Sequence, residues 1–520
     1  MNLKNYLFAL FVMLVFFCRG NGHNPTWTDG IACIVYSHCT SCHNQNGIAP
    51  FSLTTYDEVY QNRFSIAASI QARSMPPFPP SQEKQKYAHA NTLSQHEIDE
   101  LVDWVNNFAP LGNANQIPFA PSYKTNFQLS TPDKILQIPN YTVNTAKDLY
   151  RCFVLLLNNS QQEYIQQIEV VPGNRDIVHH ALIFQDTSLI PLNLDMADTL
   201  PGYTAFGSTG SPSSRLITGY TPGQGLFEYP KGFGAKINAN SYLILQIHYP
   251  GGISDKMDST QVRIKYGSNK LRNISTAAIL NHSSTLINGP LTIPPNQVKT
   301  FYNQYKVNDN ATITAIMPHM HLLGKSIKSY FVNPKGDTTT LIDIPQWDFH
   351  WQGFYQFQKP ILIPAGSTLY GEGIFDNTSQ NNNNPNNPPK TVNLGEGTDD
   401  EMFLIYFNYT AFLPGDTSLV IDTSSHYNHD ASCGNIANSI KINYSNTFSI
   451  YPNPTNDLLF IDGLGNLSGF TLYGANGQMI LSKSNLNCNE IDLSKIPSGI
   501  YYAQIKTAGN ELFYKKVIKE

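Results

Sequence analysis

The middle of the chain, from about residue 120 to residue 435, is made of short apolar or alternating runs separated by glycine, proline and asparagine. The runs read YRCFVLLL, QQIEVVPG, IVHHALIF, YLILQIHY, VRIKY, LTIPP, ATITAIMPHMHLLG, ILIPAGSTLYGEGIF and FLIYFNYT. Short runs bounded by turn residues are typical of strands, and none of these continues with a helical period. The middle region is therefore predicted to form β-sandwiches.

The length and composition indicate a multidomain, mainly β protein. With 520 residues, the chain is too long for one ordinary hydrophobic core. Charged residues make up 14% of it, against roughly 25% in an average soluble protein. Because the net charge is -5, the chain offers no basic surface, and we expect no nucleic-acid partner.

The first 22 residues have the pattern of a secretory signal peptide. A lysine-bearing head precedes an apolar run from Tyr6 to Phe17, and small residues follow it. This run is too short to span a bilayer as a helix. We expect residues 1–22 to be a signal peptide and the mature protein to act outside the cytoplasm. A membrane anchor, including lipidation at Cys18, is the alternative.

Residues 25–115 contain Cys39-Thr-Ser-Cys42-His43, the pattern of c-type haem attachment. Two thiols one helical turn apart can add to the haem vinyl groups, and the adjoining histidine is then placed as an axial iron ligand. A zinc or iron–sulfur site that adds Cys33 is the alternative, but it lacks a fourth ligand at a usual spacing.

Met75, in ARSMPPFPP, is expected to be the second axial ligand of this haem. The two prolines after it make a rigid extended loop that can hold a thioether over the haem face. A haem with two histidine ligands, using His89 or His96 in place of the methionine, is the alternative.

A helix that closes the haem pocket is predicted to begin at Ser94, which forms a capping box with Glu97. Apolar residues then follow at helical spacing, at Ile98, Leu101, Val102 and Val105. Asn106, Asn107 and Pro110 are expected to end the helix. The order of these motifs resembles the small all-α cytochrome c domains that are fused to secreted bacterial enzymes, and the resemblance implies one haem c in residues 25–115.

Five histidines of the middle region stand in apolar strand contexts: His179, His180, His248, His319 and His321. Side chains at i and i+2 of a strand leave the same face, so His319 and His321 are expected to point to one place. Adjacent histidines in a straight strand point apart. His179 and His180 can therefore share a metal only if the backbone bends or if they use different ring nitrogens.

The donor types in these motifs favour copper, with zinc as the rival. No cysteine or carboxylate stands in the immediate motifs, which leaves imidazole and thioether donors. Met317 and Met320 are nearby thioethers, and Met402 is a distant one that enters a strand after an acidic loop.

An ordered set of motifs resembles the copper type II ascorbate-dependent monooxygenase family over about 300 residues. The set is Tyr150-Arg-Cys152-Phe, Pro172-Gly-Asn before His179-His180, Gln246-x-His248-Tyr249, His319-x-His321-x-x-Gly324, WDFHWQGFYQF at 347–357, and Glu401-Met402. The resemblance implies two jelly-roll-like β-sandwich subdomains, expected at residues 125–282 and 283–435. Each would hold one copper, facing the other across a solvent-filled cleft.

The resemblance also implies roles for six side chains. His179, His180 and His248 would bind an electron-transfer copper, and His319, His321 and Met402 would bind the copper that activates oxygen. A soft thioether favours Cu(I), the state that meets dioxygen. The implied reaction hydroxylates a C–H bond of an unknown organic substrate with dioxygen. Its two electrons would come from ascorbate or from a redox protein, with the fused haem as a donor on the same chain.

The cysteines of the middle region depart from the disulfide-rich animal members of the family, since only Cys152 and Cys433 lie there. They pair with each other, or Cys433 pairs with Cys488, or all of them stay free. Substrate-binding residues do not transfer, because the loops at 190–230 and 375–400 match no peptide- or catecholamine-binding pattern.

Residues 445–520 are predicted to form a small β-sandwich, because strand-like runs with NG and SG turns recur there. YPNP, SGIYY and the KKVIK ending resemble the C-terminal sorting domain of type IX secretion. The resemblance implies the type IX secretion machinery as a partner and a secreted or cell-surface location in a Gram-negative bacterium, reached through the periplasm. An ordinary adhering module is the alternative.

The sequence therefore predicts a secreted copper monooxygenase with its own cytochrome c. A non-enzymatic copper-binding or electron-relay surface protein is the second interpretation, and a surface adhesin is the third. An adhesin has no reason to keep buried imidazoles without hydrogen-bond partners.

Overall fold

The computed structural model describes residues 25–121, 123, 127–421, 449–462, 467–474, 478–484, 489–507 and 512–520. The predicted signal peptide at 1–22, together with Cys433 and Cys488, lies outside them. The chain divides into two compact units, Met1–Asp430 and Ala431–Glu520, and each is described by itself. Strands dominate the described residues, so the prediction of a mainly β protein is confirmed.

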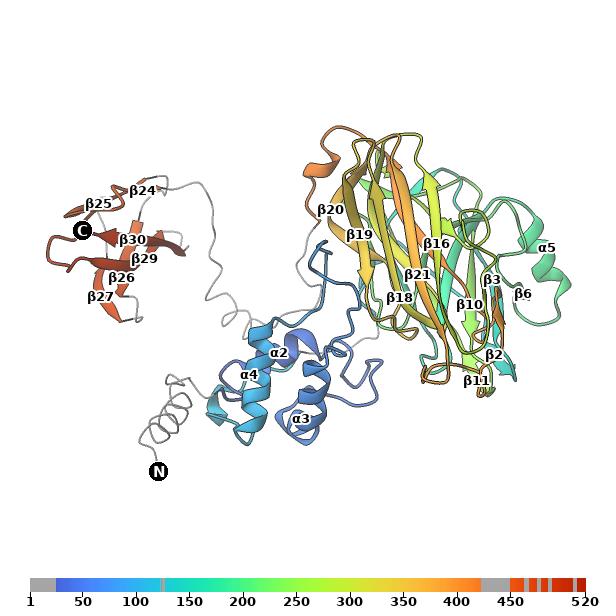
Figure 1. The fold of residues 1–520 in the computed structure, drawn as a ribbon, viewed down its shortest axis with the longest axis horizontal. Helices are drawn as coiled ribbons and strands as arrows, with labels where there is room; N and C mark the ends of the chain where they lie inside the picture. The colour runs from blue at the N-terminus through green and yellow to red at the C-terminus, as the bar shows by residue number, and fades with distance from the viewer. Residues whose placement is uncertain are drawn as a thin grey trace, which may run out of the picture. The chain divides into compact units, whose positions relative to one another are not determined.

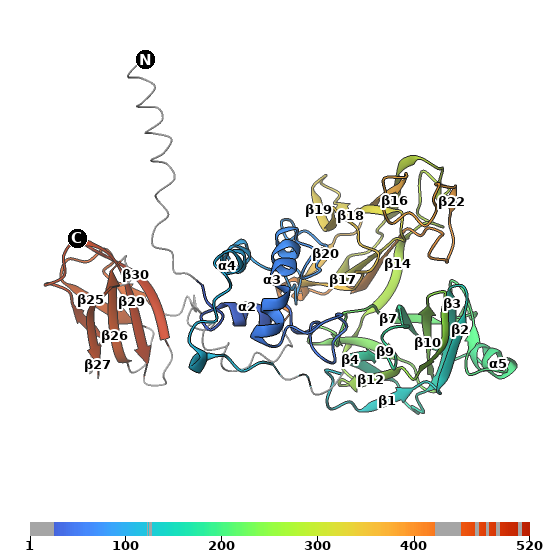
Figure 2. The ribbon, with the colours of Figure 1, turned by 90° about the horizontal axis from the view of Figure 1, so that it is seen from below.

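Three helices follow one another near the start of the first unit: α2 (Ile31–His38), α3 (Tyr56–Gln71) and α4 (Gln95–Asn106) (Figure 2). The predicted capping box of α4 is confirmed, since Ser94 and Glu97 each accept the other's backbone N–H. The Trp27 and Trp104 rings pack at the centre of this segment, 6.2 Å apart. Among the described residues, no helix combines the length and the apolar character that crossing a bilayer requires.

The first β-sandwich follows a short 3-10 turn, η1 (Ala114–Gln116), and also carries one helix, α5 (Ile190–Ala197). Its strands are β1 (Lys134–Gln137), β2 (Tyr141–Thr145), β3 (Leu149–Leu156), β4 (Glu163–Val171), β5 (His180–Asp186), β6 (Tyr203–Thr204), β7 (Arg215–Tyr220), β8 (Phe227–Glu228), β9 (Phe233–Ile237), β10 (Tyr242–Tyr249), β11 (Ile253–Asp258), β12 (Gln261–Tyr266) and β13 (Arg272–Asn273). One sheet has the order β1-β12-β4-β9-β13, with β8 beside β4, and the other has the order β6-β3-β10-β5-β7. Strands β11 and β2 form a separate pair.

The second β-sandwich consists of β14 (Ser275–Asn281), β15 (Thr292–Ile293), β16 (Gln297–Lys306), β17 (Ala311–His319), β18 (Gly324–Val332), β19 (Thr338–Ile344), β20 (Tyr355–Ile363), β21 (Thr368–Asn377), β22 (Val392–Asn393) and β23 (Leu404–Ala411), followed by the turn η2 (Asp416–Ser418). One sheet has the order β14-β23-β17-β20, and the other, which faces the viewer in Figure 1, has the order β16-β21-β18-β19. Strands β15 and β22 pair with each other.

Alternate residues of the inner strands fill the two cores. On β10 the core residues are Leu243, Leu245, Ile247 and Tyr249, so His248 leaves the opposite face of its sheet. On β23 the core residues are Ile405 and Phe407, so Leu404 and Tyr406 leave the opposite face. Each sandwich therefore presents one sheet whose outer face carries polar and apolar side chains that its own core does not use.

Cys152, on β3, is a fully buried free thiol. It packs with Tyr203 and Ile244 in a small cluster on the outer face of its sheet. The alternative in which Cys152 pairs with Cys433 is therefore wrong, because this apolar contact occupies its side chain.

The segment of residues 78–88, between α3 and α4, packs on the second sandwich. The Ala88 N–H donates to the Gln356 carbonyl at 2.8 Å. Tyr87 is 4% exposed, belongs to the core of that sandwich, and stacks on Phe357 with ring centroids 5.7 Å apart. The helical segment and the second sandwich thus share part of one hydrophobic core.

The second unit contains two antiparallel sheets. Its strands are β24 (Ser449–Tyr451), β25 (Leu458–Asp462), β26 (Leu467–Gly474), β27 (Met479–Ser484), β28 (Glu490–Asp492), β29 (Gly499–Thr507) and β30 (Leu512–Lys519), in the orders β24-β25-β28 and β27-β26-β29-β30. One core cluster takes residues from both sheets, including Leu459, Ile491, Phe470 and Ile505. The strands expected in this segment are therefore present.

Candidate metal centres

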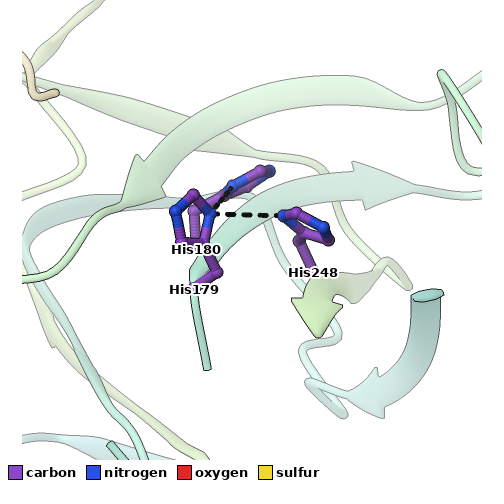
Figure 3. A group of neighbouring side chains, drawn as sticks. All are labelled: His179, His180 and His248. Atoms are coloured by element: carbon purple, nitrogen blue, oxygen red, sulfur yellow. Dashed lines mark hydrogen bonds between the residues drawn. The ribbon is translucent and has the colours of Figure 1, made fainter. Parts of the chain in front are cut away.

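His179, His180 and His248 meet at one point on the outer face of the first sandwich (Figure 3). The Nδ1 atom of His179 lies 3.2 Å from that of His180 and 3.3 Å from that of His248. One ring nitrogen from each residue lies within 4.8 Å of those of the other two. Three imidazole nitrogens at this spacing are suited to one transition-metal ion.

The backbone explains how two adjacent histidines reach the same place. Strand β5 begins at His180, which pairs with His248 of β10, so these two side chains leave the same face. His179 precedes the strand, after a turn at residues 175–177, and its N–H donates to the His248 carbonyl at 3.0 Å. The bend that the shared site requires is therefore present.

Burial keeps His179 and His180 neutral. It lowers the pKa of His179 to about 4, helped by the neighbouring His248, and it lowers the pKa of His180 well below its ordinary value. Neutral imidazoles have a lone pair ready for a metal, and three close cations would repel one another.

Asp148 and Tyr150 hold the His248 ring from two sides. The Tyr150 ring stacks on it at 4.4 Å, and the Asp148 Oδ1 atom lies 3.6 Å from its Nε2. The other Asp148 oxygen accepts the N–H of Thr398, at 2.8 Å, and its hydroxyl, at 2.5 Å. Contact with His248, followed by the Thr398 bonds, keeps the pKa of Asp148 below its usual range despite burial. Since Thr398 belongs to the second sandwich, one carboxylate connects the two halves.

His319 and His321 form a second cluster, at the end of β17. Their ring centroids are 5.1 Å apart. The Nδ1 atom of His319 lies 2.6 Å from Gln352 Oε1, and that of His321 lies 3.2 Å from the Asp400 carbonyl. Both partners are acceptors, so each Nδ1 carries the proton and each Nε2 offers its lone pair to a metal. Burial lowers the pKa values of His319 and His321 to about 4 and about 3.

Glu401 fixes the backbone around the second cluster. Its carboxylate accepts the N–H groups of His321, at 3.0 Å, Leu323, at 2.7 Å, and Met402, at 3.1 Å. Burial raises the pKa of this fully buried carboxyl to about 8, against the effect of the three N–H donors. One carboxylate thereby joins the two segments that carry His321 and Met402.

The three candidate thioethers differ in position. Met320 is fully buried in the core of the second sandwich, so it is not open to a metal. Met317 and Met402 both line a cavity that His319 also lines. In the pairing of β17 with β23, His319 faces Leu404 and Met317 faces Tyr406. Met402, two residues before Leu404, therefore lies at the end of the β17–β23 pair where the histidines are. Met317 lies two residues before His319, further from that end.

A cavity of about 360 Å³ lies between the two clusters. Its lining includes His179 and His180 from the first sandwich and His319 and Met402 from the second. Phe349 stands between the clusters, stacked on His179 at 5.2 Å and edge-on to His321 at 5.8 Å. The two clusters thus share a solvent space and are also linked through a single aromatic ring.

Asp148, Phe349, Gln352 and Asp400 are parts of the site that were not predicted from the sequence. Phe349 and Gln352 belong to WDFHWQGFYQF, which entered only as one motif of the resemblance, and that motif is the one signal that pointed to them. Asp148 and Asp400 stand in turns that look like ordinary solvated loops.

The residues predicted to attach a haem lie just after α2. The N–H groups of Cys42 and His43 both donate to the Cys39 carbonyl, at 3.2 and 2.9 Å, so the three residues make one turn. The Nδ1 atom of His43 lies 3.1 Å from the Phe51 carbonyl, which leaves Nε2 as the electron-pair donor. Cys39 and Cys42 are free thiols, as covalent attachment requires.

The candidates for the second axial ligand are spread over the helical segment. The Met75 side chain is 45% exposed. His89 is half-buried. The His96 side chain is exposed, and its Nε2 lies 3.6 Å from a Glu100 oxygen. The exposure of Met75 and the contact of His96 with Glu100 do not select between the candidates, so the choice stays a prediction.

Family comparisons match three segments of the chain. Residues 135–252 match the N-terminal domain of copper type II ascorbate-dependent monooxygenases, and residues 276–428 match the C-terminal domain. Together these matches span more than half of the chain. The chain belongs to the copper type II ascorbate-dependent monooxygenase family.

Residues 449–520 match the secretion system C-terminal sorting domain. The protein is therefore a secreted or cell-surface protein of Gram-negative Bacteroidetes, as predicted. These three matches leave residues 25–115 uncovered, so the cytochrome c-like assignment of the helical segment has no support from them.

Solved structures show only remote likeness. The exported PBSX protein XepA is 10% identical over 50% of this chain and 92% of its own, with a TM-score of 0.14. The broad bean stain virus structure is 7% identical over 54% of this chain and 93% of its own, with a TM-score of 0.23. At these scores neither structure informs the function.

Replacing Glu401 with glutamine is expected to weaken metal binding at the second cluster by about 10- to 100-fold, the usual effect of losing a group that orients a ligand. The glutamine amide has the shape of the carboxyl group, but its NH₂ group faces backbone N–H groups and cannot accept their hydrogen bonds. His321 and Met402 then no longer share one hydrogen-bond acceptor. Chelator competition with copper, with the two clusters distinguished by electron paramagnetic resonance, measures the change.

Glu169→Gln is the matched control for this variant. Glu169 is another buried carboxylate, and it accepts the N–H groups of Gln128 and Leu129 on the first sandwich. It should cost stability while leaving copper affinity unchanged. Equal copper loss in both variants would show that Glu401 acts only through general stability.

The metal-free protein is expected to lose stability as the pH falls from about 6.5 toward 4. The unfolded chain binds protons at histidine near pH 6.5, whereas burial keeps His179, His319 and His321 neutral in the folded state down to a pH of about 4 or 3. Urea unfolding at pH 7 and pH 5 measures the loss.

His179→Gln removes one of these titrating groups. Its stability should fall less over the same interval, by on the order of 1 kcal/mol. Because only the difference between parent and variant is used, titration elsewhere in the chain cancels. Identical pH dependence in parent and variant would contradict the assignment.

Proposed function

We propose that the protein is a secreted copper monooxygenase that hydroxylates a C–H bond of an organic molecule with dioxygen. The observation that carries the proposal is a cavity lined on one side by His179 and His180, of the three-imidazole cluster, and on the other by His319 and Met402, with His321 beside His319. A protein that only stored copper would have no use for a cavity open to both sets.

His179, His180 and His248 would hold one copper through their Nδ1 atoms, since these are the atoms that converge. The second copper would be held by His319 and His321 through Nε2 and by Met402 through its sulfur. When bound, copper supplies the binding of dioxygen and the one-electron steps. Membership of the family supports copper over zinc.

The surrounding residues orient these ligands and exclude water. Gln352 and the Asp400 carbonyl fix the tautomers of His319 and His321, so both keep a lone pair toward the metal. Phe349 fills the space between the clusters with an apolar ring. Asp148 connects His248 to the loop that carries Asp400, so movement of one cluster affects the other.

The electrons would reach the copper sites from a c-type haem in residues 25–115, from ascorbate, or from another redox protein. A haem bonded to Cys39 and Cys42 with His43 as axial ligand fits the local geometry, because both thiols are free and the His43 lone pair is available. Met75 is the proposed second axial ligand. Tethering on the same chain would give the donor a high effective concentration.

An electron-relay protein without oxygen insertion is the second candidate, since the contacts of Phe349 with both clusters would serve a relay equally well. Substrate-dependent oxygen uptake separates the two. A relay reduces oxygen slowly or not at all whichever organic molecule is present.

The reconstituted protein is expected to bind two copper ions per chain and to insert one atom of oxygen-18 gas into its product, with the other atom leaving as water. His248→Ala and His321→Ala should each keep one copper and lose product formation by about 100-fold or more, since each removes a ligand outright. Mass spectrometry of the product and metal analysis measure both effects. Unlabelled product, or activity that survives the loss of either copper, would refute the proposal.

A covalent haem should appear in the protein matured with haem and vanish in the double variant Cys39→Ser, Cys42→Ser. Cys152→Ser is the matched control, since Cys152 is also a buried thiol but lies in the first sandwich. In stopped-flow spectra, the reduced haem should be oxidised when copper-loaded protein meets oxygen and substrate. If the haem stays reduced, the proposal that it donates electrons on the same chain is refuted. The oxygenase proposal is not affected by that result.

A further inference from the structure

The wall of the cavity beside His319 and Met402 is largely apolar. It is formed by the sheet β14-β23-β17-β20. The residues of this sheet that line the cavity are Ala277, Ala278, Asn281, Met317, His319, Leu404 and Tyr406.

Strand alternation places these side chains next to the proposed ligands. Met317 is two residues before His319, so both leave the same face of β17. On the neighbouring strand Leu404 faces His319, and Tyr406 faces Met317. Met317, Leu404 and Tyr406 therefore form the surface next to His319 on which a molecule with a C–H bond near the histidine pair can rest.

The opposite wall, from the first sandwich, also carries apolar side chains beside its polar ones. Leu182 and Phe184 leave the face of β5 that His180 leaves, and Leu216 of β7 joins them. A molecule in the cavity would thus have apolar contacts on both sides.

No lysine or arginine is among the described residues that line the cavity. The one acidic side chain in the lining is Glu396, and two further histidines, His282 and His350, also line the cavity. An anionic group of a substrate would lose its hydration here without gaining a lysine or arginine partner, which is costly. Tyr406, Gln352 and Gln246 are neutral polar residues of the lining.

We propose that the substrate is a small uncharged molecule with an apolar body, bound on Met317, Leu404 and Tyr406 so that a C–H bond lies beside His319 and Met402. The inference rests on the proposed function and names its substrate class. The cavity volume of about 360 Å³ is at the lower end for small-molecule sites, which excludes a polymer chain as the buried part. Molecules that depend on a carboxylate or phosphate for binding are rejected.

Equilibrium dialysis tests the inference on the copper-loaded, reduced protein without oxygen, so that no turnover occurs. The probes are 3-phenylpropanamide and 3-phenylpropanoate, which share an apolar body and differ in charge. The amide should bind at least about tenfold more tightly, because only the carboxylate carries a charge into an apolar cavity. Equal or tighter binding of the carboxylate, or failure of the amide to bind, overturns the inference.

Met317→Arg should reverse the preference, because it places a guanidinium in the wall beside the substrate. The carboxylate should gain at least about tenfold relative to the amide. Met257→Arg is the matched control, since Met257 is 57% exposed on β11 and outside the cavity lining, and it should leave the ratio unchanged. If the ratio of amide to carboxylate affinity is unchanged in a Met317→Arg protein that still binds two copper ions, the inference is overturned. The comparison of the two probes on the parent protein tests the inference even if the variant does not fold.

The two proposals fail separately. If the amide binds selectively but oxygen-18 is not incorporated into any uncharged compound, the oxygenase proposal is refuted. The inference that the cavity binds uncharged molecules is then kept. Oxygen insertion into a carboxylate-bearing substrate would keep the oxygenase and refute the substrate class.

Discussion

Both candidate sites depend on strand alternation. Each sandwich has a sheet whose inner face fills its own core and whose outer face carries donors, because successive side chains of a strand leave opposite sides. On β10 this rule separates His248 from Leu245, and on β23 it separates Leu404 and Tyr406 from Ile405. A shift of one residue in either register would bury the ligands in a core and expose core residues to the cavity. Stability and metal binding therefore impose the same register.

Two carboxyl groups, Glu401 and Asp148, position the proposed metal ligands, and neither is itself a proposed ligand. Glu401 holds the backbone of His321 and Met402, and Asp148 spans from His248 to the N–H of Thr398. Both accept hydrogen bonds from backbone N–H groups. The loops that carry ligands are thus fixed by carboxyl groups, whereas the strands that carry ligands are fixed by the hydrogen bonds of their sheets.

Much of this arrangement could be predicted from sequence because it depends on local rules. The capping box at Ser94 and the strand character of the middle region follow from spacing and turn residues, and the five histidines were singled out by their apolar surroundings. The convergence of His179 and His180 is expected only from the family resemblance. Local rules do not give it, because it depends on β5 beginning at His180 and not one residue earlier. Asp148 and Gln352 were not predicted as site residues, because they contact His248 and His319 only after distant segments of the chain have folded together. Of the three alternatives left open for the cysteines of the middle region, the pairing of Cys152 with Cys433 is excluded, because Cys152 is a buried free thiol.

Tyr87 has a consequence for how the protein is divided. Its ring lies in the hydrophobic core of the second sandwich. The neighbouring Ala88 N–H donates a hydrogen bond to the Gln356 carbonyl of β20. A shortened protein beginning after residue 115 would lack this side chain and would expose Phe357 to water, at the cost of a buried aromatic contact. The helical segment is therefore not an interchangeable module, and a foreign domain grafted in its place would have to supply an equivalent aromatic side chain to the core of the second sandwich.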